Sequence, residues 1–362
     1  MATISFARGA PSPECLDAAT LADCARAAVE RDPAILGYGP AGGYAPLRAW
    51  IAERHGVAAS RVVLTNGALQ GFLFYARTLI ARRGPRVLVE APTYDRPLTL
   101  LAGLGAEVEA VPQDEDGLDL DALDDALGRG DAAFLYTIPT FQNPSGRTLP
   151  TDRRRRLTEL VREHGLPVLE DDPYGLVRYE GDAPPRLLEL EGGELVTYTS
   201  SFSKTVAPGL RVGYFVLAEP LVKPFEEAAV STYITPALLG EATVWEFVRR
   251  GLFEPNLERV RGLLRARRDA MLEALEGELG TAARWSRPEG GYFLWVDFGD
   301  EVDAGELLVR ATAAGVPFVR GEDFYPGGAG GRSAARLAFS FASPDEIREG
   351  VARLAELLPA RV

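Results

Sequence analysis

Short apolar runs alternate with helix-like stretches along the first two thirds of the chain. Runs rich in β-branched and aromatic residues predict strands at residues 61–65, 86–90, 107–111, 132–138, 167–170, 195–199 and 212–217. Several runs are apolar without strict alternation, which is typical of strands that helices cover on both faces. Helices are predicted at residues 69–81, 121–127 and 152–164. The alternation of the two element types predicts an α/β fold with a mostly parallel central sheet.

The pattern changes in the last third of the chain. Apolar residues recur at helical spacing between 257 and 275, and they predict one amphipathic helix that links two domains. Beyond it, strands are predicted at residues 292–296, 316–319 and 336–341, and helices at residues 304–314 and after Ser343. The last helix has a clear start signal, because Ser343 can cap it, Pro344 suits its first position and Glu346 can return the capping contact. The end of the chain therefore predicts a smaller α+β domain.

Length and composition bound the function. The chain has 362 residues, 46% of them hydrophobic, which supports a large domain with its own core and a smaller second one. Its formal net charge is −13 without a sustained basic tract, so we expect neither nucleic acid nor a membrane as a partner. Two cysteines, Cys15 and Cys24, are too few for a disulfide framework or a structural zinc site. These features favour small-molecule chemistry in the cytoplasm.

The chain has two histidines, His55 and His164. Each lies near the predicted end of a helix, where polar or cationic side chains suit the helix dipole, so both are interpreted as structural. A Ser-His-Asp triad or a histidine-rich metal site is therefore disfavoured, and no metal is predicted. If the chain is an enzyme, another residue type must carry the protons.

The segment 200–214 holds the most informative lysine. Lys204 lies between two predicted strands, where partial desolvation can lower its pKa and provide the neutral amine that forms an imine with an aldehyde. Ser201, Ser203 and Arg211 could then serve a phosphate, the hydroxyls by hydrogen bonding and the guanidinium by a two-pronged contact. Alone, a Ser-x-x-Lys sequence is weak evidence, so the surrounding residues decide its meaning.

This segment resembles the lysine signature of the fold type I pyridoxal phosphate enzymes of the class I/II aminotransferase family. The matching residues are Ser201-Phe202-Ser203-Lys204 and Gly209-Leu210-Arg211-Val212-Gly213. The resemblance covers nearly the whole chain, and its pattern is most similar to α-aminoadipate and aromatic aminotransferases and to the aminotransferase-like domain of MocR regulators. It implies an aspartate-aminotransferase-like fold and a pyridoxal 5'-phosphate cofactor, which Lys204 holds as a Schiff base.

The resemblance also assigns residues around the cofactor ring. Asn143, within Gln142-Asn143-Pro144-Ser145-Gly146, is implied to donate a hydrogen bond to the ring oxygen and to touch the substrate carboxylate. Asp171 is implied to pair with the pyridine nitrogen, because a carboxylate there favours the protonated, electron-accepting ring. Asp172 is the rival for that role. Tyr174 is implied to hydrogen bond the ring oxygen, and Tyr94 to stack on the ring face.

Two further segments complete the cofactor site by resemblance. Gly67 and Ala68 follow a predicted strand and begin a helix, a position where main-chain N–H groups bind phosphate. Ala68 departs from relatives that carry a hydroxyl there, so the two serines and the arginine near Lys204 are expected to hold more of the phosphate. Tyr38, in a segment that continues Tyr-Ala-Pro-Leu-Arg from Tyr44, is implied to reach the phosphate of a neighbouring subunit. A homodimer with two shared sites is therefore predicted.

Residues near the two ends of the chain are implied to bind the substrate. Arg336, within Ala335-Arg336-Leu337-Ala338, resembles the arginine that grips the substrate α-carboxylate, a task that suits its planar fork. Gly9 is implied to be a main-chain neighbour of the substrate. Arg8 departs from the family, which commonly has glycine there. It could pair with an acidic substrate group or equally with an acid of its own surface.

The resemblance implies a transaminase that moves an amino group between an L-amino acid and a 2-oxo acid, with Lys204 as anchor and proton shuttle. The same residues suit elimination, cyclisation, racemisation or oxygen-dependent oxidation, so these pyridoxal phosphate reactions stay open as alternatives. A third hypothesis is a ligand-sensing domain without turnover, as in MocR regulators. The acidic charge disfavours it, since those regulators carry a basic DNA-binding domain ahead of this body.

Three parts are predicted along the chain. Residues 1–38 form an N-terminal segment over the active site that packs with the small domain. Residues 39–255 form the large cofactor-binding domain, and residues 256–362 form the small C-terminal domain.

Overall fold

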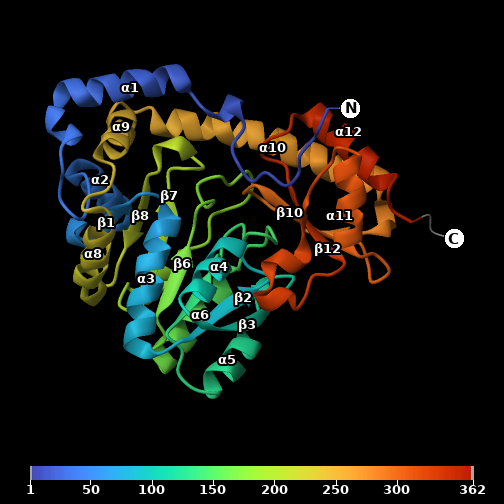
Figure 1. Ribbon diagram of the computed structural model, residues 1–362, viewed down its shortest axis with the longest axis horizontal. Helices are drawn as coiled ribbons and strands as arrows, with labels where there is room; N and C mark the ends of the chain where they lie inside the picture. The colour runs from blue at the N-terminus through green and yellow to red at the C-terminus, as the bar shows by residue number, and fades with distance from the viewer. Residues whose placement is uncertain (1, 360–362) are drawn as a thin grey trace.

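The computed structural model describes residues 2–359, which form a large and a small sheet with helices around them (Figure 1). The large sheet has the strand order β1-β8-β7-β6-β5-β2-β3-β4. Its strands are β1 Val62–Thr65, β2 Arg86–Ala91, β3 Glu107–Asp114, β4 Gly117–Leu118, β5 Phe134–Thr137, β6 Val168–Asp171, β7 Val196–Ser201 and β8 Gly213–Val216. The neighbours from β3 through β2, β5 and β6 to β7 are parallel, whereas β8 is antiparallel to both β7 and β1. The predicted mostly parallel sheet is confirmed.

Helices cover both faces of this sheet, which explains why most positions of its strands are apolar and buried. All four residues of β1 and of β5 are buried. One face packs against α2 Ala45–His55, α5 Leu120–Gly128, α6 Thr151–His164, α7 Leu187–Glu191 and α9 Leu238–Arg249. The other face packs against α3 Ala68–Arg83, α4 Asp95–Gly103 and α8 Glu219–Tyr233. Burial on both faces stabilises the sheet and fixes where its strands end.

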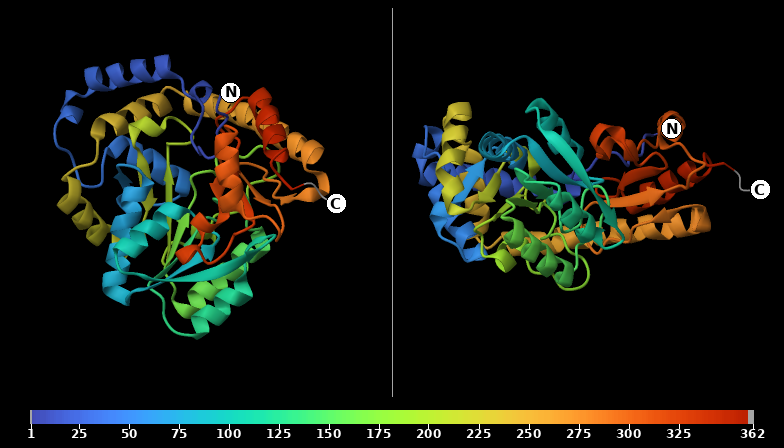
Figure 2. Two further views of the ribbon diagram at one scale, coloured as in Figure 1. Left: turned by 45° about the vertical axis from the view of Figure 1, so that its right-hand side comes forward. Right: turned by 90° about the horizontal axis from the view of Figure 1, so that it is seen from below.

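The long helix α10, Phe253–Glu278, leads from the large sheet to the C-terminal part (Figures 1 and 2). There, an antiparallel sheet has the order β11-β12-β10-β9. Its strands are β9 Arg284–Trp285, β10 Phe293–Asp297, β11 Val319–Arg320 and β12 Ala334–Ala338, and the helices of this part are α11 Ala304–Ala313 and α12 Pro344–Ala355. Apolar residues of α10, α11, α12 and this sheet share one core.

The N-terminal residues join both parts of the molecule. Ile4 N donates to Gly315 O at 2.7 Å and Phe6 N to Pro317 O at 2.8 Å, which holds the first segment against the small sheet. The next helix, α1 Ala18–Arg31, lies instead beside α9 (Figure 1). The N-terminal segment thus crosses the gap between the two sheets, and the three-part division of the chain stays a prediction.

Two predicted strands of the small sheet were misplaced. Residues 316–319 were predicted as a strand, but β11 is Val319–Arg320, because Pro317 O pairs with the N-terminal segment instead. Residues 336–341 were predicted as another, but β12 is Ala334–Ala338, since its register with β10 ends at the pair Ala338 and Phe293. Both errors come from pairing between distant segments.

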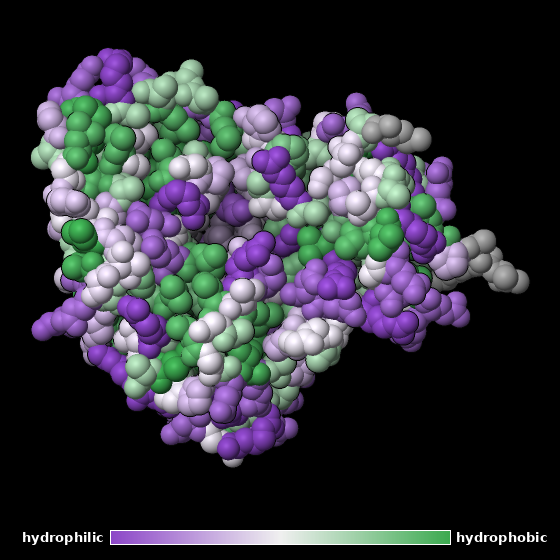
Figure 3. All heavy atoms as spheres, in the orientation of Figure 1, coloured by the Kyte–Doolittle hydropathy of each residue, from purple (hydrophilic) through white to green (hydrophobic). Residues whose placement is uncertain are grey.

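The surface of the described part shows two relevant features. The face in Figure 3 is hollowed near its centre, and hydrophilic side chains lie around and within the hollow. Between residues 2 and 359, no helix is long and apolar enough to cross a membrane.

Candidate active site

One cavity of about 590 Å³ brings together most of the predicted site residues. It is lined by Gly9, Ala68, Tyr94, Asn143, Asp171, Tyr174, Ser201, Ser203, Lys204, Arg211 and Arg336. These residues come from the carboxyl ends of parallel strands, from β12 and from the N-terminal segment. Open α/β sheets collect ligands at that edge, so the fold explains why segments far apart in sequence meet here.

Lys204 lies in this cavity with its amine held by the N-terminal segment. Its Nζ donates to Gly9 O at 2.8 Å. Burial, together with the charges of Arg336 and Arg211, lowers the pKa of Lys204 to about 8. At pH 7 roughly a tenth of Lys204 is therefore the free amine, against far less for an ordinary lysine, and this form can act as a nucleophile or a proton acceptor.

Asp171 and Asp172 have separate surroundings. Asp171 lines the Lys204 cavity, its Oδ2 accepts a hydrogen bond from Tyr136 Oη at 2.7 Å, and burial raises its pKa to about 7. Asp172 is outside this cavity; its Oδ1 accepts from Gly175 N at 2.7 Å and its Oδ2 from Tyr198 Oη at 3.0 Å. The structure therefore places Asp171, and not Asp172, where a carboxylate could meet a bound ligand.

Arg336 is buried at the small-sheet side of the cavity. Its Nη1 donates to Asn143 Oδ1 at 2.9 Å and its Nη2 to Ala7 O at 3.0 Å, while its Nε has no partner among the described residues. Its guanidinium lies over the ring of Phe293 at 4.2 Å, and burial lowers its pKa. A buried cation with an unpaired N–H is costly by itself, so this group suits an anionic ligand.

The opposite end of the cavity forms an anion cradle at the start of α3. Gly67 has a φ of +88°, and a Cβ there would overlap the guanidinium of Arg211. A Cβ on Gly213 would likewise overlap Ala68 N. Ser201 and Arg211 also line this region. Helix-terminal N–H groups, hydroxyls and a guanidinium together suit a phosphate.

Aromatic residues form the walls between these two ends. Tyr94 lines the cavity, and burial raises its pKa. Tyr174 is buried and packs edge-on against Phe293 with 5.7 Å between ring centroids. An amine, a carboxylate, an anion cradle and flat walls in one cavity fit pyridoxal phosphate.

Three predicted site residues lie elsewhere. Gly67 lies beside Arg211 without lining the cavity itself. Arg8 is exposed, does not line the cavity, and its guanidinium lies over the ring of Phe341 at 4.3 Å. Tyr38 is 81% exposed and does not line this chain's own cavity.

Sequence reasoning missed several residues of the site. Tyr136 was not singled out, because only the strand order places β5 beside β6 and its hydroxyl against Asp171. Phe293 and Arg96 also line the cavity. The position of Arg96, two residues after Tyr94, was the one signal that could have identified it.

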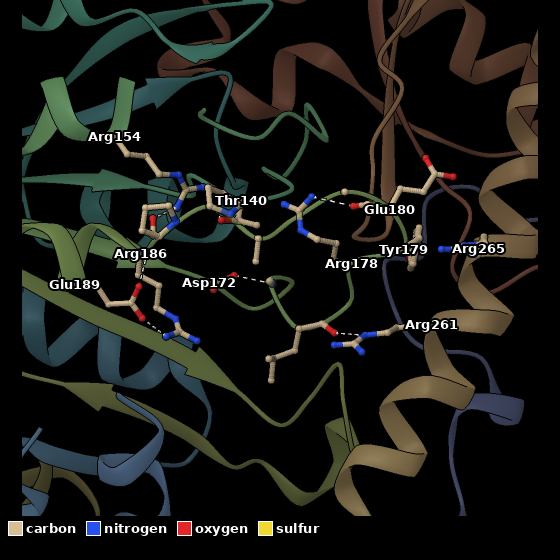
Figure 4. Close-up of a pocket in the computed structure, with 16 residues that line it drawn as sticks. Thr140, Arg154, Asp172, Arg178, Tyr179, Glu180, Arg186, Glu189, Arg261 and Arg265 are labelled. Carbon is tan, nitrogen blue, oxygen red and sulfur yellow. Dashed lines mark hydrogen bonds and ion pairs between the residues drawn. The ribbon is translucent and has the colours of Figure 1, made fainter. Parts of the chain in front are cut away.

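A second cavity, of about 670 Å³, is lined largely by the segment that follows β6 (Figure 4). Several arginines line it, and three of them have partners: Arg178 donates to Glu180 O at 3.1 Å, Arg261 to Leu176 O at 2.9 Å, and Arg186 pairs with Glu189 at 2.5 Å, although Nε and Nη2 of Arg178 have no partner among the described residues. Of the predicted candidates, it contains the rival Asp172. The reactive groups gather instead around Lys204.

The histidines lie outside the Lys204 cavity. His55 packs against the ring of Tyr198 at 4.7 Å, and burial lowers its pKa to about 3. His164 lies 3.3 Å from Asp124. Within residues 2–359, no group of three or more His, Cys, Asp or Glu side chains is placed to hold a metal ion.

Comparison with known proteins gives a family match over nearly the whole chain. The family described as aminotransferase class I and II matches residues 4–354. The 2-aminoadipate transaminase of Thermus thermophilus is 37% identical over 359 residues, 98% of this chain and 90% of that protein. Aromatic-amino-acid aminotransferase 1 of Thermococcus litoralis is 32% identical over 367 residues, 98% of this chain and 88% of that protein.

A solved structure extends this similarity to the fold. The alpha-aminoadipate aminotransferase from Thermus thermophilus, complexed with N-(5'-phosphopyridoxyl)-L-leucine, matches with a TM-score of 0.93 at 37% identity. The match covers 98% of this chain and 92% of that one. The predicted aspartate-aminotransferase-like fold is confirmed.

Proposed function

This chain belongs to the class I and II aminotransferase family, and on that premise we propose that its amino transfer is carried out by the residues of the Lys204 cavity. It is a pyridoxal phosphate-dependent transaminase. When bound, the cofactor supplies the electron sink that makes the α-hydrogen of an amino acid acidic. This assignment rests on one observation: Lys204, Asp171, Arg336 and the anion cradle line the same cavity.

Each end of the cavity would hold one part of the cofactor. Ala68, Ser201, Ser203 and Arg211, with the turn at Gly67, would bind its phosphate. Asp171 would pair with the ring nitrogen, because a carboxylate with a raised pKa in a buried site gains from a cationic partner. Tyr94 would stack on the ring face. Tyr174 and Asn143 would both hydrogen bond the ring oxygen.

Lys204 would anchor the cofactor and move the proton. Its lowered pKa provides a neutral Nζ, which can accept the α-proton of the bound amino acid. The Gly9 carbonyl that now accepts from Nζ lies on the N-terminal segment, so that segment both orients the amine and covers it. Held between the ring site and Arg336, the substrate would present one bond to the amine, which favours a single reaction.

Arg336 and Asn143 would bind the substrate α-carboxylate. Arg336 already donates to two neutral oxygens, of Asn143 and Ala7, and keeps Nε unpaired. A carboxylate would replace a neutral acceptor by a charged one and form a stronger, two-pronged contact. Arg8 lies outside the cavity, so we do not assign it to the substrate.

The active form would be a homodimer in which Tyr38 reaches the partner's site. Four large apolar side chains are exposed on one region of the chain: Leu36, Tyr38, Ile234 and Leu239. Gly39 N donates to Thr235 Oγ1 at 3.3 Å, which brings the Tyr38 loop beside the turn between α8 and α9. Exposed apolar groups in one region mark an interface, and two-fold symmetry lets one patch pair with its own copy.

A single-turnover assay tests the reaction. The purified enzyme is mixed with a panel of L-amino acids, without a 2-oxo acid acceptor and with or without oxygen. We expect one donor class to yield about one 2-oxo acid per site, independent of oxygen, and Lys204→Ala to yield none. Oxygen uptake or ammonia release would instead identify oxidation or elimination.

The chain offers a clean control for this assay. It contains two lysines, Lys204 and Lys223, and the latter is exposed on α8. Lys223→Ala should therefore leave product formation unchanged.

The cytoplasm, inferred from the cysteine count, remains the proposed location.

A further inference from the structure

Four cationic side chains line the active-site cavity: Arg96, Lys204, Arg211 and Arg336. In the proposed function, on which this inference rests, three of them have a partner. Arg211 meets the cofactor phosphate, Lys204 anchors the cofactor, and Arg336 takes the substrate α-carboxylate. Arg96 is the cation without an assigned anion.

Arg96 lies at the start of α4, two residues after Tyr94. Its side chain is 62% exposed, and its one ion pair among the described residues joins Nε to Asp95 Oδ2 at 3.5 Å. Its two terminal nitrogens are therefore available for an end-on, two-pronged contact with another carboxylate.

The electrostatics connect Arg96 to the substrate site. Burial is the main cause that lowers the pKa of Arg336; the charge of Asp95 opposes this shift, and the charge of Arg96 adds a smaller contribution that lowers the pKa. The two guanidinium groups thus lie within electrostatic reach across one cavity. A molecule with carboxylates at both ends would relieve their repulsion.

The acids at the same rim do not cancel this preference. Asp323 also lines the cavity, but its Oδ1 accepts from Arg320 Nε at 2.9 Å. Asp171, the third acid of the cavity, is paired with Tyr136 and assigned to the cofactor ring, so Asp95 is the acid that competes for Arg96, and that ion pair is long and partly exposed. Exposed pairs of this kind contribute about 0–1 kcal/mol, so a substrate carboxylate can displace Asp95.

We propose that Arg96 binds the distal carboxylate of a dicarboxylic substrate, an amino acid or 2-oxo acid whose side chain ends in a second carboxylate. Arg336 holds one end of such a substrate and Arg96 the other. Because Arg96 is exposed and loosely held, it can also stay turned to solvent when the second substrate of the cycle has no distal charge.

Binding of inert ligands to the enzyme as isolated tests Arg96 directly. Isothermal titration calorimetry compares glutarate, a dicarboxylate, with pentanoate, its monocarboxylate analogue of equal length. The native enzyme should bind glutarate about tenfold more tightly, and Arg96→Gln should abolish that preference while leaving pentanoate unchanged. Arg77→Gln is the charge-matched control, since Arg77 is exposed on α3 and does not line the cavity.

The neighbouring acid gives a test of opposite sign. Asp95→Asn removes the carboxylate that competes for Arg96, so glutarate should bind more tightly in this variant. The proposal is overturned if Arg96→Gln retains the glutarate preference, if it weakens both ligands equally, or if Asp95→Asn weakens glutarate binding.

Acceptor kinetics separate this inference from the proposed function. Arg96→Gln should raise the KM for 2-oxoglutarate about tenfold and leave kcat/KM for pyruvate unchanged. If the native enzyme releases no 2-oxo acid from any amino acid in the single-turnover assay, the proposed function fails. If pyruvate and 2-oxoglutarate respond equally to the substitution, the function stands and the role of Arg96 is wrong.

Discussion

Asp171 and Asp172 show how one step along the chain separates two roles. Successive residues at a strand end point to opposite sides, so Asp171 enters the Lys204 cavity while Asp172 lines the second cavity. We expect Asp171→Asn to lower kcat at least about a hundredfold, or about 2.7 kcal/mol in activation free energy, because it removes the charge proposed for the ring nitrogen. Asp172→Asn should change kcat by less than about threefold. Steady-state rates of both variants decide this, and equal losses would reverse the assignment.

The amine of Lys204 predicts a pH dependence in the cofactor-free enzyme. Burial lowers its pKa from the ordinary 10.5 to about 8, so the neutral, reactive form appears as pH rises through about 8 rather than above 10. Stopped-flow absorbance should show covalent capture of pyridoxal phosphate accelerating across that range. Lys223→Ala should give the same profile, and a midpoint near 10 would show that the cavity does not lower the pKa.

Gly67 is required for two separable reasons. Its φ of +88° strains any other residue, and a Cβ would also overlap Arg211. Gly56 is a matched control, because its φ is +63° and an added Cβ meets nothing within 4 Å. Both substitutions to alanine should cost about 1 kcal/mol of folding free energy. Only Gly67→Ala should also weaken pyridoxal phosphate binding, by about tenfold in an equilibrium titration of the cofactor-free enzyme.

At the scale of elements, the residue pattern predicted a helix or strand correctly where that element depends on interactions between residues close in sequence. The central strands were found because both of their faces are buried. The helices α8 and α9 were not, and α8 contains Pro224 in its interior, which sequence reasoning treats as a break. The two-residue strands β4 and β9 form only by pairing with longer neighbouring strands, so the residue pattern within each of them does not predict a strand.

The start of α12 is an element that the sequence did specify. Ser343 Oγ accepts from Glu346 N, and Ser343 N donates to Glu346 Oε2 at 2.7 Å, as the capping pattern predicted. Ser343→Ala should lower the free energy of unfolding by about 1 kcal/mol in urea titrations and leave kcat unchanged. Ser231→Ala, on an exposed interior position of α8, should cost nothing, because alanine is the better helix former there. An equal loss in both variants would argue against a capping effect.

At the scale of the molecule, the family resemblance predicted most of the residues that line the cavity. Arg8 and Tyr38, which lie outside it, are exposed on the surface of the chain. Eleven predicted residues meet because parallel strands place their carboxyl ends at one edge, and because β12 and the N-terminal segment bring Arg336 and Gly9 to the same edge. The orientation of Arg8 toward Phe341 could not be predicted, since it depends on how the small sheet packs against the N-terminal segment. Tyr38 could be predicted by resemblance alone, because its side chain is 81% exposed and does not line the cavity of its own chain.

The proposal of shared sites in a homodimer can be tested by mixing two inactive variants. A Lys204→Ala subunit keeps Tyr38 but has no reactive lysine, and a Tyr38→Ala subunit keeps Lys204 but lacks the tyrosine that its partner needs. After equal mixing and subunit exchange, about a quarter of all sites would combine an intact Lys204 with an intact Tyr38 from the other chain. We therefore expect the mixture to exceed the mean activity of the two variants, with Lys204→Ala mixed with native enzyme as the exchange control. Activity equal to that mean, despite exchange shown by differently tagged subunits, would mean that each chain completes its site alone.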